Sequence, residues 1–229
     1  MFKFIKEVDN LSEGKELNQK DSFKNIEESN EFSIEEATDF WDGELSEKYQ
    51  EYEENYSQYL TEIYNNAEDD FGYNFEINDE LNEAISKFDS EEWNHMTDGE
   101  KIDAINNVKE LVSKELGLSS VPETTYFDDD WGPNGFYDAY SNTININIEK
   151  SFLSDSKEML NTIIHELRHA FQWERADCLE TREDFLYRCN IENYIDAYKS
   201  FYAYEDQYVE VDARAYADAL IKTYEEAVA

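Results

Sequence analysis

The 229-residue chain has few of the residues that interrupt helices, with two prolines and seven glycines. Proline breaks the interior of a helix and glycine weakens it, so their scarcity favours long helices and few strands. Hydrophobic residues make up 40% of the sequence, which is enough for one sizeable core or for a main domain with an extension. We therefore expect a helix-rich α+β fold.

Basic residues are also scarce: 19 Lys and Arg stand against 56 Asp and Glu, which gives a formal net charge of -37. The acidic excess is spread over both halves of the chain, so we expect no basic patch that could bind nucleic-acid phosphates or an anionic membrane surface. Cationic protein partners or substrates would be attracted, although a solvated acidic surface without a particular partner is the commoner case.

The sequence contains no apolar run long enough to span a membrane, and residues 1–7 lack the apolar stretch of a signal peptide. We therefore expect a cytoplasmic protein, with leaderless export as the alternative. The only cysteines, Cys178 and Cys189, are too far apart to pair along one straight helix. We expect both thiols to be reduced and unpaired.

Histidine is rare as well, and two of the three histidines lie in one short motif. The sequence His165-Glu166-Leu167-Arg168-His169 matches the pattern HExxH. Residues four apart lie on one face of a helix, so the two histidines can share a metal ion, while Glu166 is turned toward a bound water. A hydrolytic zinc site requires this arrangement. The alternative is a helix that carries two histidines by chance.

The segment around the motif has the features of a helix. Asp155 and Glu158 have the spacing of an N-terminal capping box. Apolar residues then recur at helical spacing, namely Leu160, Ile163, Ile164, Leu167, Ala170 and Phe171. We expect a helix with one buried stripe and with the histidines on its flank.

A third metal ligand must be acidic, because no histidine follows the motif. Glu210 is the best candidate, since it shares one face of a predicted helix over 209–220 with Ala213, Ala217, Leu220 and Tyr224. Small residues on that face let a second helix approach closely. Asp212 has a shorter side chain on a neighbouring face and is the second candidate. Alternatively, Glu210 is a solvated first-turn acid that favours the helix dipole.

These residues resemble the HExxH zincin metallopeptidases, in the branch whose third ligand is a glutamate on a later helix, the gluzincins. Residues 210–213 resemble a Glu-x-x-Ala element, and the flanks of the motif look like those of bacterial and phage-type metallopeptidase domains. The resemblance covers roughly residues 120–229. It implies one Zn²⁺ held by His165, His169 and Glu210, and an endopeptidase rather than an exopeptidase. Where some gluzincins have a further acid, this chain has Arg214.

The implied chemistry is hydrolysis of a peptide bond. Zinc with three protein ligands keeps a position for water and lowers the pKa of that water from about 16 to about 7. Glu166 would act as the general base, and a nearby donor would stabilise the oxyanion. The sequence does not choose among the candidate donors Tyr194, Tyr198, Tyr202, Tyr204, Tyr208 and Tyr216. Aromatics at such spacings are more often packing residues.

A hairpin is expected before the motif, with arms at 135–140 and 144–148 around a turn at 141–143. Residues 121–127 are a candidate third strand. In families of this kind a sheet lies beside the active-site helix, and its edge strand binds the substrate backbone by strand addition. A hairpin that only covers the core is the alternative.

Further helices are expected at 45–63, at 78–88 after the N-cap Asn78, and between Thr97, which opens a capping box, and Gly117. His95 is expected to pack at the entry of the last of these. We divide the chain into an acidic, mainly helical region over 1–90, flexible over about the first 35 residues, and a zincin-like domain over 91–229.

Two non-catalytic interpretations remain open. In the first, the chain is an acidic interaction protein whose zinc is structural, so that a fourth protein ligand such as Asp212 or His95 fills the position of the water. In the second, the chain is an acidic mimic of nucleic acid that occupies a basic protein and does not need its histidines.

Overall fold

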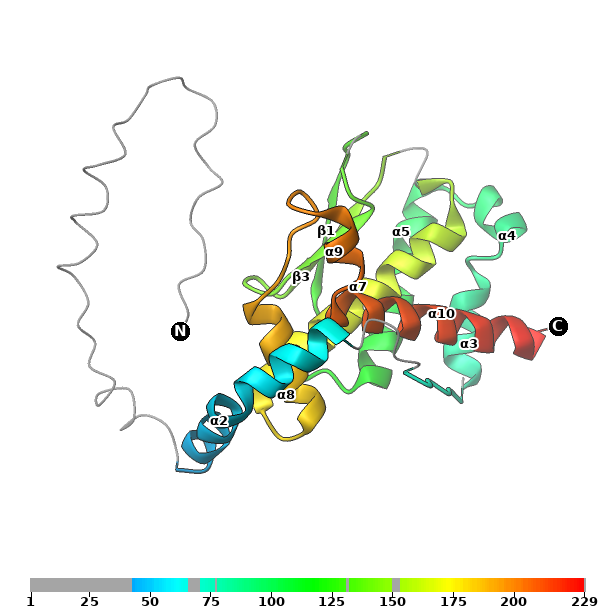
Figure 1. The fold of residues 1–229 in the computed structure, drawn as a ribbon. Helices are drawn as coiled ribbons and strands as arrows, with labels where there is room; N and C mark the ends of the chain where they lie inside the picture. Colours follow the sequence, from blue (N-terminus) through cyan, green and yellow to red (C-terminus); the bar gives the residue numbers. More distant parts are fainter. Residues whose placement is uncertain (1–42, 66–70, 77, 131, 150–152, 229) are drawn as a thin grey trace, which may run out of the picture. The chain divides into compact units, whose positions relative to one another are not determined.

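The structure is a computed structural model that describes residues 43–65, 71–76, 78–130, 132–149 and 153–228. The chain divides into two compact units, residues 1–46 and 47–229, and almost all described residues belong to the second. This unit is helix-rich with a small mixed sheet, which confirms the expected α+β class (Figure 1). The described elements, in chain order, are α2 (Gly43–Asn65), α3 (Asp79–Ser86), α4 (Ser90–His95), α5 (Asp98–Leu116), β1 (Glu123–Phe127), β2 (Gly135–Asp138), β3 (Thr143–Asn147), α7 (Ser156–Cys178), α8 (Arg182–Glu192), α9 (Phe201–Glu205) and α10 (Tyr208–Val228).

The division between the two units does not coincide with the boundary expected at residue 90. Ile85 and Phe88, in and just after α3, pack in one core with residues of α5, α7 and α10. Tyr52 and Tyr59 of α2 pack in a second core with Phe185 of α8. Helices that precede residue 90 therefore support the helix that carries HExxH. The expected flexibility of the first 35 residues lies outside the described part.

The predicted helix ends are confirmed at several positions. The side chain of Asn78 caps α3, and Asp155 caps α7. Thr97 and Glu100 form the predicted capping box of α5, and Gly117 ends that helix in the left-handed conformation, with φ 70°. The prediction for His95 is wrong: this residue is exposed at the end of α4, and its Nδ1 atom contacts the carbonyl of Glu91.

Helices α8 and α9 were not predicted. Thr181 and Asp184 form a capping box at the start of α8, with aspartate in the place of the usual glutamate. That pair was the available sequence signal. The two cysteines are free thiols, with Cys178 at the end of α7 and Cys189 buried in α8.

The sheet has the strand order β1-β3-β2, with β3 parallel to β1 and antiparallel to β2. The predicted hairpin and the third strand are therefore confirmed. The central strand β3 is more buried than its alternating sequence indicates. Its last residue, Asn147, is buried because its amide donates to the carbonyls of Asp129 and Pro133 and its oxygen accepts from the backbone of Glu149.

Helix α7 lies at the centre of this unit and contacts α5, α8, α10, β2 and β3 (Figure 1). Strand β2 approaches α7 so closely that a Cβ atom at Gly135 would lie 2.8 Å from Cγ2 of Thr162. A different face of α7 bonds to α10 through Asn161, Arg168 and Gln172, which share one face by their spacing. His165 and His169 lie beside the face of α7 that bonds to α10.

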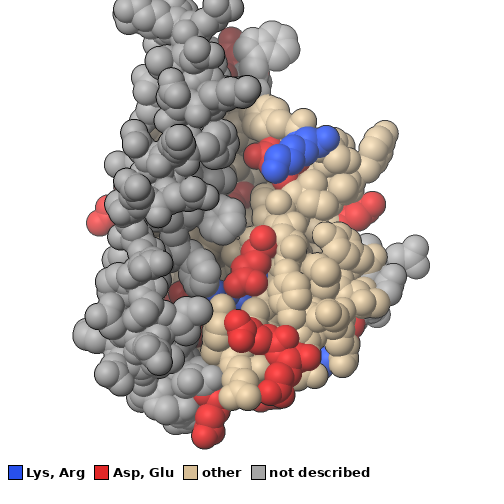
Figure 2. Space-filling model, turned by 60° about the vertical axis from the view of Figure 1, so that its left-hand side comes forward, with Lys and Arg blue, Asp and Glu red and all other residues tan. Residues whose placement is uncertain are grey.

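Acidic side chains outnumber basic ones among the charged residues of the chain. Figure 2 shows Asp and Glu gathered in the lower part of one face, with few Lys or Arg among them. None of the described helices combines the length and the apolarity that a membrane crossing requires.

Candidate metal centre

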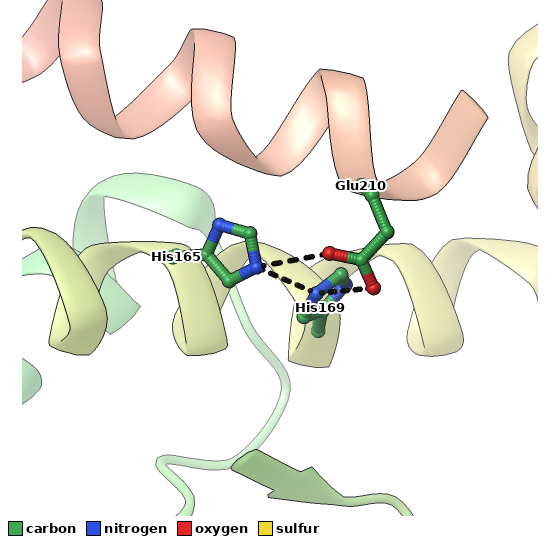
Figure 3. A group of neighbouring side chains, drawn as sticks. All are labelled: His165, His169 and Glu210. Atoms are coloured by element: carbon green, nitrogen blue, oxygen red, sulfur yellow. Dashed lines mark hydrogen bonds and ion pairs between the residues drawn. The ribbon is translucent and has the colours of Figure 1, made fainter. Parts of the chain in front are cut away.

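Three side chains from two helices meet beside α7, as Figure 3 shows. The Nε2 atoms of His165 and His169 lie 3.0 Å apart. Glu210 of α10 places Oε2 at 3.3 Å from Nε2 of His165 and Oε1 at 3.5 Å from Nε2 of His169. The structure thus brings together the three residues that the sequence singled out as metal ligands. Within the described residues, they form a group that could hold a metal ion.

The separations between these atoms fit a tetrahedral ion. Zinc binds histidine nitrogen and carboxylate oxygen at about 2.1 Å, so two ligand atoms on a tetrahedral ion lie about 3.4 Å apart. The two nitrogens lie 3.0 Å apart, and each carboxylate oxygen lies 3.3 or 3.5 Å from one of them, so the site has about the size that such an ion requires. Two histidines four residues apart on α7 supply the nitrogens. Ala213 and Ala217 of α10 are fully buried, so α10 packs closely enough on α7 for Glu210 to reach them.

Glu210 has an unsatisfied oxygen. Its side chain is only 1% exposed, and no described group donates a well-formed hydrogen bond to Oε2. A buried acceptor without a donor costs about 1–3 kcal/mol, and more when it is charged. Its nearest neighbour is the imidazole of His165, which can offer a lone pair as readily as a proton. A cation shared with the histidines would satisfy this oxygen.

Gln172 determines which nitrogen of His169 carries the proton. The Nε2 group of Gln172 donates to the carbonyl of Val209, at 2.9 Å, and to Asp212, at 2.6 Å. Oε1 of Gln172 must therefore be the atom 2.7 Å from Nδ1 of His169, and that nitrogen donates. The neutral imidazole then has its lone pair on Nε2, the atom that faces Glu210. Metal-binding histidines usually have such a partner on the other nitrogen.

Asp212 lies in a hydrogen-bond network next to the site and does not face the histidines. Nε of Arg168 donates to it at 2.9 Å, and the hydroxyl of Tyr187 donates at 3.0 Å. Tyr73 and Gln172 are further donors. The alternative that Asp212 is the third ligand is therefore wrong. Its position holds Gln172 in place, and Gln172 in turn orients His169.

The pKa values reflect the close approach of opposite charges. Burial disfavours the charged form of His169, but the carboxylate of Glu210 outweighs it and raises the pKa of His169 to about 9. Burial also acts to raise the pKa of Glu210, yet the two histidines hold that pKa far below its usual range. Glu210 is thus an anion at neutral pH, as a metal ligand must be.

Glu166 follows His165 on α7 and is buried, with 7% of its surface exposed. It lies close enough for its charge to help raise the pKa values of His169 and of two tyrosine hydroxyls, those of Tyr194 and Tyr204. The structure therefore places the predicted base beside the predicted ligands.

The six tyrosines considered as donors fall into three groups. Tyr194 donates to Oε1 of Glu210 at 2.7 Å, and the ring of Tyr204 lies 6.1 Å from that of Tyr194. Burial and the charge of Glu210 raise the pKa of both hydroxyls, so both remain protonated. The other four lie elsewhere: Tyr208 and Tyr216 are buried packing residues, whereas Tyr198 and Tyr202 are exposed.

Sequence reasoning missed the roles of Gln172 and Arg168. No role was expected for Gln172 from the sequence, although its spacing of three from His169 places the two on one helical face. That spacing was the available signal. The partners of Gln172 on α10 are about 40 residues away in the chain, so they could not be read from local sequence.

Comparison with known proteins finds no matching family model, no matching curated protein and no matching solved structure. A functional assignment therefore depends on the geometry and chemistry of the site itself.

Proposed function

We propose that the chain is a zinc-dependent metallopeptidase of the zincin type, with His165, His169 and Glu210 as ligands. The observation that carries this proposal is that the two histidine nitrogens and the carboxylate of Glu210 lie within 3.0–3.5 Å of one another, while one oxygen of that buried carboxylate lacks a donor. The orientation of His169 adds support, because the bond between its Nδ1 atom and Gln172 turns Nε2, the atom that would bind the metal, toward the other ligands.

Zinc bound by three protein ligands supplies a Lewis acid and a water molecule with a pKa of about 7. When zinc is bound, Glu166 would accept a proton from the attacking water on its carboxylate and pass it to the leaving amine. Its carboxylate is buried beside the histidines, where it could act on a water at the metal. Because the two ligand histidines precede and follow Glu166 on one helix, the base and the ligands form a single rigid unit.

Two tyrosines are suited to stabilise the oxyanion that forms at the substrate carbonyl. Tyr194 and Tyr204 both remain protonated and both lie against Glu210. Tyr194 is the stronger candidate, since its hydroxyl is already within hydrogen-bond distance of a ligand atom. Preorganised donors of this kind typically contribute about 10²–10³ in kcat.

An extended peptide is the substrate form that the surroundings of the site favour. Strand β2 is paired with β3 on one side only within the described sheet, and it runs against α7. A peptide that adds to this edge would bind through its backbone and pass beside the histidine helix. Recognition through the backbone favours cleavage within a chain, that is, an endopeptidase.

A structural zinc site is less well supported. A closed site needs a fourth protein ligand in the position of the water. His95 contacts the backbone of its own helix, and Asp212 has its oxygens engaged by Arg168 and its neighbours. Within the described residues, the group that can bind an ion has three members.

The test is to measure zinc content and peptide cleavage on the same protein preparations. The full chain, Glu166→Gln, Glu210→Ala and the control Glu226→Gln, an exposed acid of α10, are incubated with an unbiased peptide library. We expect one zinc per chain and cleavage for wild type and control, zinc without cleavage for Glu166→Gln, and weakened zinc binding for Glu210→Ala. A wild-type chain that takes up no zinc on reconstitution contradicts the proposal.

A further inference from the structure

A pocket lies next to the candidate metal centre on α7. Its volume is about 220 Å³, and its lining includes Tyr137, Asn142, Ala170, Trp173, Glu174 and Asp177. Ala170 directly follows His169, and Trp173 lies four residues, or one helical turn of about 5.4 Å, beyond it. The opposite wall comes from the segment after α5, from Tyr137 of β2 and from the turn between β2 and β3. The pocket therefore lies between the end of β2 and the helix that carries the two histidines.

The charged side chains that line the pocket are all acidic. Asp177 is paired with Arg188 at 3.0 Å, so its charge is partly neutralised. Glu174 accepts hydrogen bonds from the backbone and the hydroxyl of Ser119, which are uncharged donors. None of these contacts neutralises the carboxylate of Glu174, and they hold it at the pocket.

Aromatic rings provide a second attraction for a cation. The side chain of Trp173 is 42% exposed although it lies next to the core, and the ring of Tyr137 is part of the same lining. A cation over an aromatic face gains about 0.5–1 kcal/mol at an exposed site and about 2 kcal/mol when desolvated. An aliphatic stem ending in a positive charge would satisfy both the rings and Glu174.

We propose that this pocket binds an Arg or Lys side chain of the peptide substrate next to the scissile bond. The inference depends on the proposed peptidase function and names its substrate class. The pocket is smaller than the roughly 300–1,000 Å³ of sites that hold whole small ligands, so it suits one side chain. Its lining begins at Ala170, the residue after the ligand His169, so the side chain that it holds would belong to a residue near the scissile bond. The acidic surface in Figure 2 attracts such substrates at long range.

The first readout is the choice between matched peptides. Peptides that differ only by Arg or citrulline, its uncharged isostere, compete for zinc-loaded wild type, Glu174→Gln and Glu226→Gln. We expect wild type to prefer Arg by about tenfold in kcat/KM. Glu174→Gln retains an acceptor for Ser119 and should lower this preference below about twofold. Glu226→Gln makes the same change in net charge away from the pocket and should retain the preference.

The second readout does not require activity. N-acetyl-arginine amide and its citrulline analogue are titrated into the metal-free chain, and the indole N–H resonance of Trp173 is followed by NMR, assigned through its loss in Trp173→Phe. We expect the arginine probe to shift this resonance and Glu174→Gln to weaken its binding at least about fivefold.

The two readouts separate the two proposals. Cleavage without preference for Arg over citrulline overturns the pocket proposal and leaves the peptidase proposal intact. A wild-type chain that binds zinc but cleaves nothing counts against the peptidase proposal, and the titration then decides the pocket. An equal response of Trp173 to both probes, or one unchanged by Glu174→Gln, overturns the pocket proposal.

Discussion

Glu210 and Asp212 are two buried acids on the same turn of α10, and both face basic or imidazole groups of α7. Asp212 receives hydrogen bonds from Arg168, Tyr187, Tyr73 and Gln172. Glu210 receives one from Tyr194, and its Oε2 atom lacks a donor. Asp212 is thus hydrogen-bonded by donors of the protein, whereas Glu210 lies against two imidazole nitrogens.

This difference separates a structural acid from a candidate ligand. A carboxylate with a structural role can accept hydrogen bonds on all of its lone pairs, whereas a carboxylate that binds a metal must keep one lone pair free. Satisfied and unsatisfied acids two residues apart should therefore respond differently to substitution. Loss of Asp212 should act mainly on stability, and loss of Glu210 mainly on metal binding.

The largest effect is expected for Asp212→Ala. This change leaves the guanidinium of Arg168 buried without its carboxylate, which typically costs about 3–5 kcal/mol. Denaturant unfolding of the metal-free chain measures the loss. Glu226→Ala, at an exposed acid on the same helix, is the control and should change stability by about 0.5 kcal/mol or less. Equal losses in the two variants would remove the distinction between the acids.

Glu210→Gln should weaken zinc binding by more than about 100-fold, or about 2.7 kcal/mol, because the amide is a poor replacement for an anionic ligand. Competition with a chromophoric chelator gives the dissociation constant. Glu226→Gln has the same change in charge on the same helix and should bind zinc as wild type does. Wild-type zinc affinity in Glu210→Gln would show that the carboxylate is not a ligand.

Gln172→Leu should weaken zinc binding by about 10–100-fold, since it removes the partner that holds Nδ1 of His169 protonated. The same competition assay applies, with circular dichroism to show that the helices persist. Gln58→Leu on α2, at an exposed position, is the matched control. An unchanged zinc affinity would mean that His169 is oriented by packing alone.

The smallest effect on zinc affinity is expected for Tyr194→Phe, which removes the hydrogen bond that the partly exposed Tyr194 hydroxyl donates to Glu210. Such a bond contributes about 0.5–1.5 kcal/mol, so zinc affinity should fall by about tenfold at most. The loss of peptide cleavage should be larger, because the hydroxyl is also the proposed oxyanion donor. Equal losses of affinity and of kcat would restrict Tyr194 to supporting the ligand.

The parts of the fold and site that could be predicted are those set by local spacing. The positions of His165 and His169 follow from the helical period, and Asp155 and Thr97 cap helices through neighbouring backbone groups. Glu210 could be singled out because alanines on its face allow a close approach of α10. Each of these inferences needs only a few consecutive turns of one helix.

The parts that could not be predicted depend on contacts between distant segments. Gln172 bonds to residues about 40 positions away, and the burial of Asn147 comes from a loop that folds over the end of β3. Tyr194 could not be distinguished from its neighbours, because the choice is made by the path of the chain between α8 and α9. Periodicity contains no information about that path.

The amide of Gln172 also has a consequence for how α10 is seated on α7. Its two ends differ chemically, and Nε2 bonds at once to the carbonyl of Val209 and to Asp212, the residues on either side of the Glu210 turn. A displacement of α10 by one residue, about 1.5 Å along its axis, would break both bonds and move the carboxylate away from the histidines. Together with Asn161 and Arg168, the amide of Gln172 thus fixes the axial alignment of the two helices and holds Glu210 opposite the histidines.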